Sequence, residues 1–230
     1  MSETVLKSRD HLALALDVDD LVLANRLARQ LRPYFGVAKV GLELYSAVGP
    51  DSIGTLKAMG YDVFLDLKLH DIPTTVRRAS RVLGALGASY LTMHAHGGVD
   101  MLRAGVEGLA DGAGRAGLET PKALAITVLS SDADAPPHIM PKRVRVAVEA
   151  GCKGLVCAAG DLKDAREFAP RLLRVTPGIR GVSGERHDQP RAVTPIEALD
   201  SGADLLVIGR AVTEAPDPVA AAEELFADLD

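Results

Sequence analysis

The chain has 230 residues, of which 47% are hydrophobic and 25% are charged, with a formal net charge of −5 at pH 7. A chain of this length can bury a sizeable core, and its acidic balance and few basic runs argue against a nucleic-acid-binding surface. No stretch approaches the roughly 18 apolar residues of a membrane span, and the opening MSETVLKSRD holds no apolar signal region. We therefore expect a cytoplasmic protein without nucleic-acid or membrane partners.

Eight short apolar segments with strand-forming residues recur along the chain, separated by stretches with helical spacing. The segments are 12–17, 37–41, 62–69, 90–95, 123–129, 154–158, 173–178 and 205–209. Helical spacing is clear over 21–31, and a later helix is expected to stop at Gly151. Eight strand–helix units predict an α/β protein, a closed (β/α)8 TIM barrel spanning 1–230 as a single domain. An open doubly wound sheet is the alternative, but no GxGxxG motif follows the first segment.

The carboxyl ends of the predicted strands are rich in polar and charged residues. In this architecture the active site is built where those ends meet, so several strands contribute side chains to one mouth. The residues that we expect there are Asp17, Lys39, Asp66, Lys68, Ser130, Arg180, Gly209 and Arg210. An isolated ion pair does not account for so many charges at one end of a barrel.

The segment 64–75, FLDLKLHDIPTT, begins like a buried strand but carries charged residues. Side chains alternate along a strand, so Asp66 and Lys68 share one face while three leucines share the other. Buried charges require a partner. The charged residues therefore form either an ion pair at a strand end or a functional site. We predict a row of alternating charges formed by Lys39, Asp66, Lys68 and Asp71. The alternative for Asp71 is that it, or Thr75, caps a helix that begins here.

The last two strand ends have the features of a phosphate site. In such barrels phosphate commonly sits at the loops after strands seven and eight, bound by backbone N–H groups. Gly209 lets a phosphate approach the backbone, and Arg210 offers a bidentate guanidinium. The long polar stretch 178–195 has a length typical of a lid or a disordered loop. As a lid, its part 181–189 would close over the phosphate and exclude water. The alternative is a solvated loop beside a surface arginine.

Neither the histidines nor the cysteines predict a metal or redox site. His94 and His96 lie two apart on the fourth predicted strand and point the same way, but the remaining histidines, His70 among them, do not fall at matching positions. We interpret the pair as packing or substrate-contacting residues. Cys152 and Cys157 fit neither a CxxC motif nor zinc spacing, so we expect two reduced core thiols. We predict no metal and no cofactor.

Six motifs, taken together and in this order, resemble the orotidine 5′-phosphate decarboxylase family over nearly the whole chain. They are ALDVDD, AKVGLELY, FLDLKLHDIPTTV, VTPGIR, DQPRAVTP and VIGRAVTEAPDP. The resemblance implies a barrel of the ribulose-phosphate-binding type and cofactor-independent decarboxylation of orotidine 5′-phosphate to UMP. It also implies a homodimer with shared sites, in which Asp71 and Thr75 reach into the neighbouring subunit.

The resemblance further implies a role for each site residue. The charged row, Lys39, Asp66, Lys68 and Asp71, is implied to be catalytic. Asp17 and Lys39 are implied to bind the ribose, Ser130 the pyrimidine, and Thr75 to contribute from the neighbouring subunit. The implied phosphate-binding residues are Arg180, Gln189, Gly209 and Arg210. Two positions depart from the family pattern: Thr74 stands where Asn is usual, and Ser130 where Thr is common.

Charge placement then suggests a mechanism. Loss of carbon dioxide leaves negative charge on ring carbon 6, and the Lys68 ammonium is expected to stabilise that charge and donate the proton. Two other functions stay open. One is a related Mg²⁺-dependent decarboxylase or aldolase acting on a sugar phosphate, and the other is a non-catalytic phosphate-binding barrel.

Overall fold

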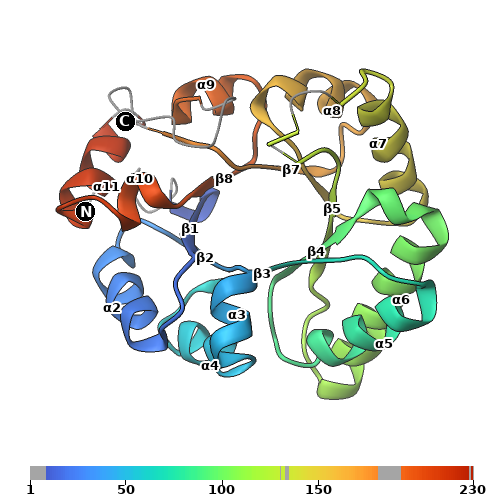
Figure 1. Ribbon diagram of the computed structural model, residues 1–230, viewed down its shortest axis with the longest axis horizontal. Helices are drawn as coiled ribbons and strands as arrows, with labels where there is room; N and C mark the ends of the chain where they lie inside the picture. Colours follow the sequence, from blue (N-terminus) through green and yellow to red (C-terminus); the bar gives the residue numbers. More distant parts are fainter. Residues whose placement is uncertain (1–8, 130, 133–134, 181–192, 228, 230) are drawn as a thin grey trace.

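The computed structural model describes residues 9–129, 131–132, 135–180, 193–227 and 229, and the structural statements below concern these residues. Eight parallel strands pair in chain order and close into a barrel (Figure 1). They are β1 Leu12–Leu16, β2 Val37–Val40, β3 Asp62–Leu69, β4 Tyr90–His94, β5 Lys122–Ile126, β6 Gly154–Val156, β7 Leu173–Thr176 and β8 Leu205–Ile208. The predicted (β/α)8 barrel is confirmed, and the open doubly wound sheet is wrong. The assignment of 1–230 to one domain reaches beyond the described residues and stays a prediction.

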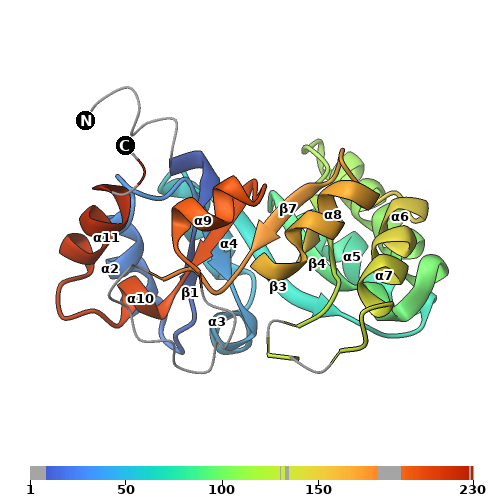
Figure 2. The same cartoon turned by 90° about the horizontal axis from the view of Figure 1, so that it is seen from above.

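Helices surround the barrel, as two views at right angles show (Figures 1 and 2). The α-helices are α2 Leu21–Leu31, α3 Leu42–Val48, α4 Asp51–Ala58, α5 Pro73–Gly84, α6 Gly98–Ala116, α7 Ile139–Glu149, α8 Leu162–Phe168, α9 Pro195–Asp200, α10 Arg210–Thr213 and α11 Pro218–Ala227. Short 3-10 helices lie at η1 Arg9–His11, η2 Ala95–Gly97 and η3 Ala159–Asp161. Among the described helices, none has both the length and the apolar character needed to cross a bilayer.

Two helix predictions are confirmed by the local geometry. The helix expected over 21–31 is α2, and the carboxylate of Asp20 accepts hydrogen bonds from the first-turn amides of Val22 and Leu23. Helix α7 ends at Glu149, and Gly151 follows with a φ of 82°. Glycine adopts this left-handed conformation without the steric penalty of a side chain, which makes it a stop signal.

The apolar core has two parts, one inside the wall of the barrel and one between that wall and the helices. Inside the barrel, alternate strand residues pack together, among them Ala13, Ala15, Phe64, Tyr90 and Leu124. The rings of Phe64 and Tyr90 meet edge to face with 5.9 Å between their centroids. The intervening residues point outward and pack against the helices in a larger cluster. Because inward positions recur at every second residue, the same alternation brings the charged residues to the mouth.

Several strands end earlier than the apolar pattern predicts. The fifth segment was expected to run to residue 129 and the sixth to residue 158, but β5 ends at Ile126 and β6 at Val156. Val128, Leu129 and Cys157 instead line a cavity just beyond the last strand pairings. Apolar residues there cover the cavity rather than continue the ladder, which is why the sequence pattern extends past the strands.

Candidate active site

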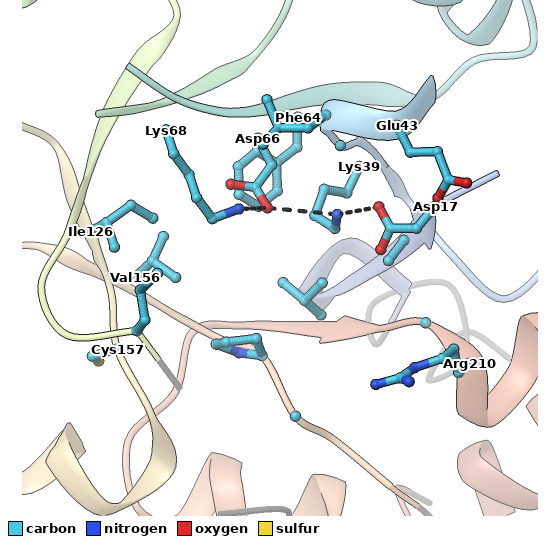
Figure 3. Close-up of a pocket in the computed structure, with 18 of the residues that line it drawn as sticks. Asp17, Lys39, Glu43, Phe64, Asp66, Lys68, Ile126, Val156, Cys157 and Arg210 are labelled. Carbon is cyan, nitrogen blue, oxygen red and sulfur yellow. Dashed lines mark hydrogen bonds and ion pairs between the residues drawn. The ribbon is translucent and has the colours of Figure 1, made fainter. Parts of the chain in front are cut away.

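A cavity of about 370 Å³ opens at the carboxyl ends of the strands (Figure 3). Its charged lining residues are Asp17, Lys39, Glu43, Asp66, Lys68, Arg180 and Arg210. Charged residues from strands β2 and β3 and from the segments after β1, β2, β7 and β8 therefore meet at one mouth, as predicted from the strand ends. Figure 3 shows Lys68, Asp66, Lys39 and Asp17 along one side of the cavity and Arg210 on the opposite side.

Four of the charged side chains form a continuous row of ion pairs. The Nζ atom of Lys39 lies 2.9 Å from Asp17 Oδ1 and 3.6 Å from Asp66 Oδ2. The Nζ atom of Lys68 lies 2.8 Å from the same Asp66 Oδ2 atom. Lys39 is only 7% exposed, so its ammonium depends on these two carboxylates for compensation. Gly41 permits the approach, because a Cβ atom there would lie 2.3 Å from Asp17 Oδ1.

Asp66 is the centre of this row. Burial alone would raise the pKa of its carboxyl group, because a low-dielectric surrounding disfavours the charged form. The ammonium groups of Lys39 and Lys68, together with hydrogen bonds from Lys68 and Thr92, outweigh that effect and hold the pKa below its ordinary value of 3.8. Asp66 is therefore a carboxylate at neutral pH, and it presents one oxygen to both ammonium groups.

Strand β3 loses its regular pairing where the charges begin. Leu65 pairs with Leu91, but the next pairing joins Leu69 to Met93, so the register shifts between them. Within this irregular stretch Lys68 has a φ of 50°, which is the sole positive φ outside glycine among the described residues. Its backbone N–H donates to Thr92 Oγ1 at 2.9 Å. Thr92 was not predicted to belong to the site. In a strand pattern, a threonine cannot be distinguished from other β-branched residues that only pack in the core.

Asp71 and Thr75 lie away from the cavity of their own chain. Both are exposed and neither belongs to the cavity lining. The N-cap of α5 is Ile72, without a side-chain cap hydrogen bond, and Pro73 follows at the first position. Asp71 Oδ1 accepts from the backbone N–H of Ile72 at 2.6 Å. The interpretation of Asp71 or Thr75 as the helix cap is therefore wrong, and their position leaves both side chains available to another molecule.

The predicted phosphate residues line the same cavity as the charged row. Arg180, Gly209 and Arg210 all belong to its lining, and Arg180 is buried with 7% exposure. Gly209 is the N-cap of the short helix α10, and Arg210 is the first residue of that helix. Ser130, Gln189 and the predicted lid 181–189 lie outside the described residues, so their roles stay predictions.

The histidines are arranged differently from the prediction. His94 ends β4 while His96 lies in η2, so the two are not on one strand. His70 contacts both, with ring centroids 5.7 Å from His94 and 5.5 Å from His96. Burial, followed by the positive charges of His70, Lys68 and other neighbours, lowers the pKa of His94. Within the described ranges, no group of three or more His, Cys, Asp or Glu side chains is arranged to hold a metal ion.

The apolar part of the lining was not predicted as part of the site. Phe64, Ile126 and Val156 contribute to it, and Cys157 stands beside them (Figure 3). Their inward alternation with the strand residues below is the signal that identifies them. The prediction of two reduced core thiols is confirmed, since Cys152 and Cys157 are both buried and free. Burial raises the pKa of each thiol to about 12.

Comparison with known proteins identifies the family of the chain that carries this site. Residues 10–225 match the model of the orotidine 5′-phosphate decarboxylase / HUMPS family. The chain belongs to this family. It is 40% identical over 237 residues to an orotidine 5′-phosphate decarboxylase of Moorella thermoacetica, covering 98% of this chain and 94% of that one. The family resemblance read from the six motifs is thus confirmed.

Two further relatives agree with this assignment to the orotidine 5′-phosphate decarboxylase / HUMPS family. An orotidine 5′-phosphate decarboxylase of Thermobifida fusca is 44% identical over 230 residues, covering 95% of each chain. The crystal structure of the corresponding Lactobacillus acidophilus protein superposes with a TM-score of 0.81 at 34% identity, covering 96% of this chain and 99% of that one. The resemblance therefore extends over the whole barrel rather than over a single motif.

Proposed function

We propose that this protein decarboxylates orotidine 5′-phosphate to UMP without a cofactor. The observation that carries the proposal is the row Lys39–Asp66–Lys68 at the wall of a cavity whose opposite side holds Arg210, in a chain of this family. The charged row is suited to a reaction at the ring of the substrate. Arg210, on the opposite side of the cavity, is suited to binding the phosphate of the same substrate. The relatives described above are named for this activity. We also propose that the protein works in the cytoplasm.

The reaction requires stabilisation of a carbanion. Loss of carbon dioxide leaves negative charge on ring carbon 6, where no adjacent carbonyl can delocalise it as in a β-keto acid. In the proposed mechanism the ammonium of Lys68 stabilises this charge and then donates its proton to the carbon. Asp66 holds that ammonium at 2.8 Å, so the donor is oriented before the substrate arrives.

We assign substrate binding to other residues of the lining and to Ser130 and Gln189, which lie outside the described part of the chain. Asp17 and Lys39 contact the ribose in this proposal, and Ser130 contacts the pyrimidine. Arg180, Gln189, Gly209 and Arg210 bind the phosphate, which is far from the reacting carbon. Binding energy from a remote group can lower the barrier at the reacting centre, particularly if a lid excludes water.

The proposed site is completed by a second subunit. Asp71 and Thr75 are exposed at the start of α5, at the end of the segment that carries Lys68. In an isologous dimer each chain would place these residues at the mouth of its partner. Asp71 of the neighbour would then be the second carboxylate beside Lys68, giving the alternating row predicted from the sequence.

Subunit mixing tests the shared site. Lys68→Ala and Asp71→Ala are each expected to be nearly inactive. In a mixed dimer both defects fall in one site and the other site is native, so random re-pairing should restore roughly a quarter of wild-type activity. If no activity returns although mass spectrometry shows that the subunits have exchanged, the shared site is wrong. The four charges of the predicted row, Lys39, Asp66, Lys68 and Asp71, would then belong to one chain.

The activity itself is tested by the fall in near-ultraviolet absorbance when the purified protein meets orotidine 5′-phosphate. The fall should persist in excess EDTA, because the proposed stabiliser is an ammonium group. Activity lost on chelation and restored by Mg²⁺ would favour the sugar-phosphate alternative. Binding of the nucleotide without turnover would favour the non-catalytic barrel.

A further inference from the structure

Thr92 is a buried hydroxyl directly behind the charged row. It lies in the middle of β4, opposite Leu124 of β5, and is 0% exposed. Its Oγ1 atom lies 2.9 Å from the backbone N of Lys68 and 3.0 Å from Asp66 Oδ1. A single side chain from the neighbouring strand thus contacts both members of the Lys68–Asp66 pair.

The chemistry of the partners fixes the direction of both hydrogen bonds. A backbone N–H can only donate, so the hydroxyl accepts from Lys68. A carboxylate can only accept, so the hydroxyl proton points to Asp66 Oδ1. The other oxygen of Asp66, Oδ2, is then the one that faces the ammonium groups of Lys68 and Lys39, at 2.8 and 3.6 Å. One hydroxyl therefore determines how the carboxylate is shared.

The same hydroxyl supports an irregular backbone. Pairing resumes at Leu69 with Met93 after Leu65 with Leu91, so residues 66–68 all lie opposite Thr92 alone. Such an insertion deprives the backbone of regular ladder partners. The hydroxyl of Thr92 accepts from the N–H of Lys68, whose φ of 50° is a conformation that a lysine rarely adopts. Strain of this kind persists only where the surroundings enforce it.

We propose that Thr92 is a positioning residue for the proton donor: it holds the Lys68 backbone in its left-handed conformation and turns Asp66 so that one oxygen serves both lysines. The proposal rests on the proposed decarboxylase function, and it assigns to Thr92 no contact with the substrate. Its effect reaches the reaction through Lys68 and Asp66, which separates it from the residues that line the cavity.

Thr92→Val tests this role because valine nearly matches the shape of threonine but lacks the hydroxyl. We expect kcat to fall about 10- to 100-fold, the range typical when a group that orients a functional residue is lost. KM should stay within about twofold of wild type, since the proposed ribose and phosphate contacts are unchanged. Loss of the hydrogen bond should also raise the pKa of Asp66, so the acid limb of the kcat profile should move to higher pH.

Two comparisons exclude a purely structural effect. Thr92→Ser keeps the hydroxyl and should recover most of kcat. Thr176→Val changes another fully buried strand threonine, whose side chain contributes to none of these contacts, and should leave kcat near wild type. If Thr92→Val does not fold, Thr92→Ser and Thr92→Ala provide the same test, because they differ only in the hydroxyl.

The outcomes separate this proposal from the proposed function. A wild-type protein without turnover contradicts the function, and the titration of the Asp66 carboxyl carbon, followed by ¹³C NMR and assigned with Asp66→Asn, then still tests the role of Thr92. A raised Asp66 pKa in Thr92→Val supports the positioning role. An active wild type, with Thr92→Val equal to it in kcat, pH profile and Asp66 titration, would overturn that role.

Discussion

The two ends of the barrel interior are built from the same strands but have opposite chemistry. Toward the amino ends, Phe64, Tyr90 and Leu124 pack in an apolar layer with regular strand pairing. Two residues further along β3, Asp66 begins a charged row, and pairing becomes irregular. Asp66 still follows the inward alternation of Phe64, so the two layers differ in residue type and in the regularity of strand pairing. The lower layer is suited to stability and the upper layer to chemistry.

The energetics of the upper layer support this division. Buried ion pairs are often no more stabilising than apolar residues of similar volume, because desolvation offsets their attraction. Lys39 and Asp66 are therefore poorly explained by stability alone. An apolar layer at the mouth would close the barrel equally well but would leave no charge to act on a substrate. If the two layers are separable, a substitution in one of them should leave the property carried by the other unchanged.

The largest effect is expected for Lys68→Ala, which removes the proposed proton donor. Activity should fall on the order of 10⁴-fold, because both charge stabilisation and proton transfer are lost. The free energy of unfolding should change by under about 1 kcal/mol, since Asp66 keeps Lys39 as a partner and Lys68 is partly exposed. The absorbance assay and thermal denaturation measure the two effects. A variant that keeps a hundredth of the activity would remove Lys68 from this role.

Arg210→Ala changes the opposite side of the cavity. Truncating a charge-assisted partner typically costs about 2–5 kcal/mol, which corresponds to roughly 30- to 5,000-fold in kcat/KM. The loss should appear with orotidine 5′-phosphate and be nearly absent with the phosphate-free nucleoside, which should be a poor substrate for either protein. Steady-state kinetics with both substrates measure the difference. An equal loss with both would mean that Arg210 does not bind the phosphate.

Leu124→Ala changes the apolar layer without touching the cavity lining. Leu124 is fully buried, so its truncation should lower the free energy of unfolding by about 2–5 kcal/mol. Activity well below the unfolding temperature should stay near wild type. Leu124→Met is the matched control, because it conserves volume and should cost under about 1.5 kcal/mol. Denaturant titration provides the measurement, and a stable but inactive Leu124→Ala would show that the two layers are not separable.

The lower layer and most of the upper one could be predicted from the sequence. Alternating apolar residues locate the strands, and the same alternation puts Asp66 and Lys68 on one face because the period of a strand is two. What could not be predicted depends on contacts between strands. Thr92 is recognisable only when the shifted register brings it opposite Lys68, and His70 joins His94 and His96 only through the turn after β3. A cap at Asp71 was locally reasonable, but the helix begins one residue later.

Acid stability provides a smaller and more specific test of the charged row. The pKa of Asp66 lies below its ordinary value of 3.8, so its ionised form stabilises the folded protein above that pH. This contribution is lost as the pH falls through the lowered pKa. The difference in free energy of unfolding between wild type and Asp66→Asn should therefore be constant near neutral pH and shrink below about pH 3.8. Denaturant titrations across this range would contradict the row if the difference stayed flat.

The smallest effect is expected at the two cysteines, both of which belong to the apolar cluster that packs between the barrel and the helices. Cys157 lines the cavity and Cys152 lies outside its lining, but burial raises the pKa of both thiols to about 12. At pH 8 only about one thiol in ten thousand is then the reactive thiolate, so iodoacetamide should label neither cysteine of the native protein within an hour. Both should react after unfolding in guanidinium, as intact mass would show. Rapid labelling of Cys157 alone would mean that the apolar wall of the cavity admits water and reagent.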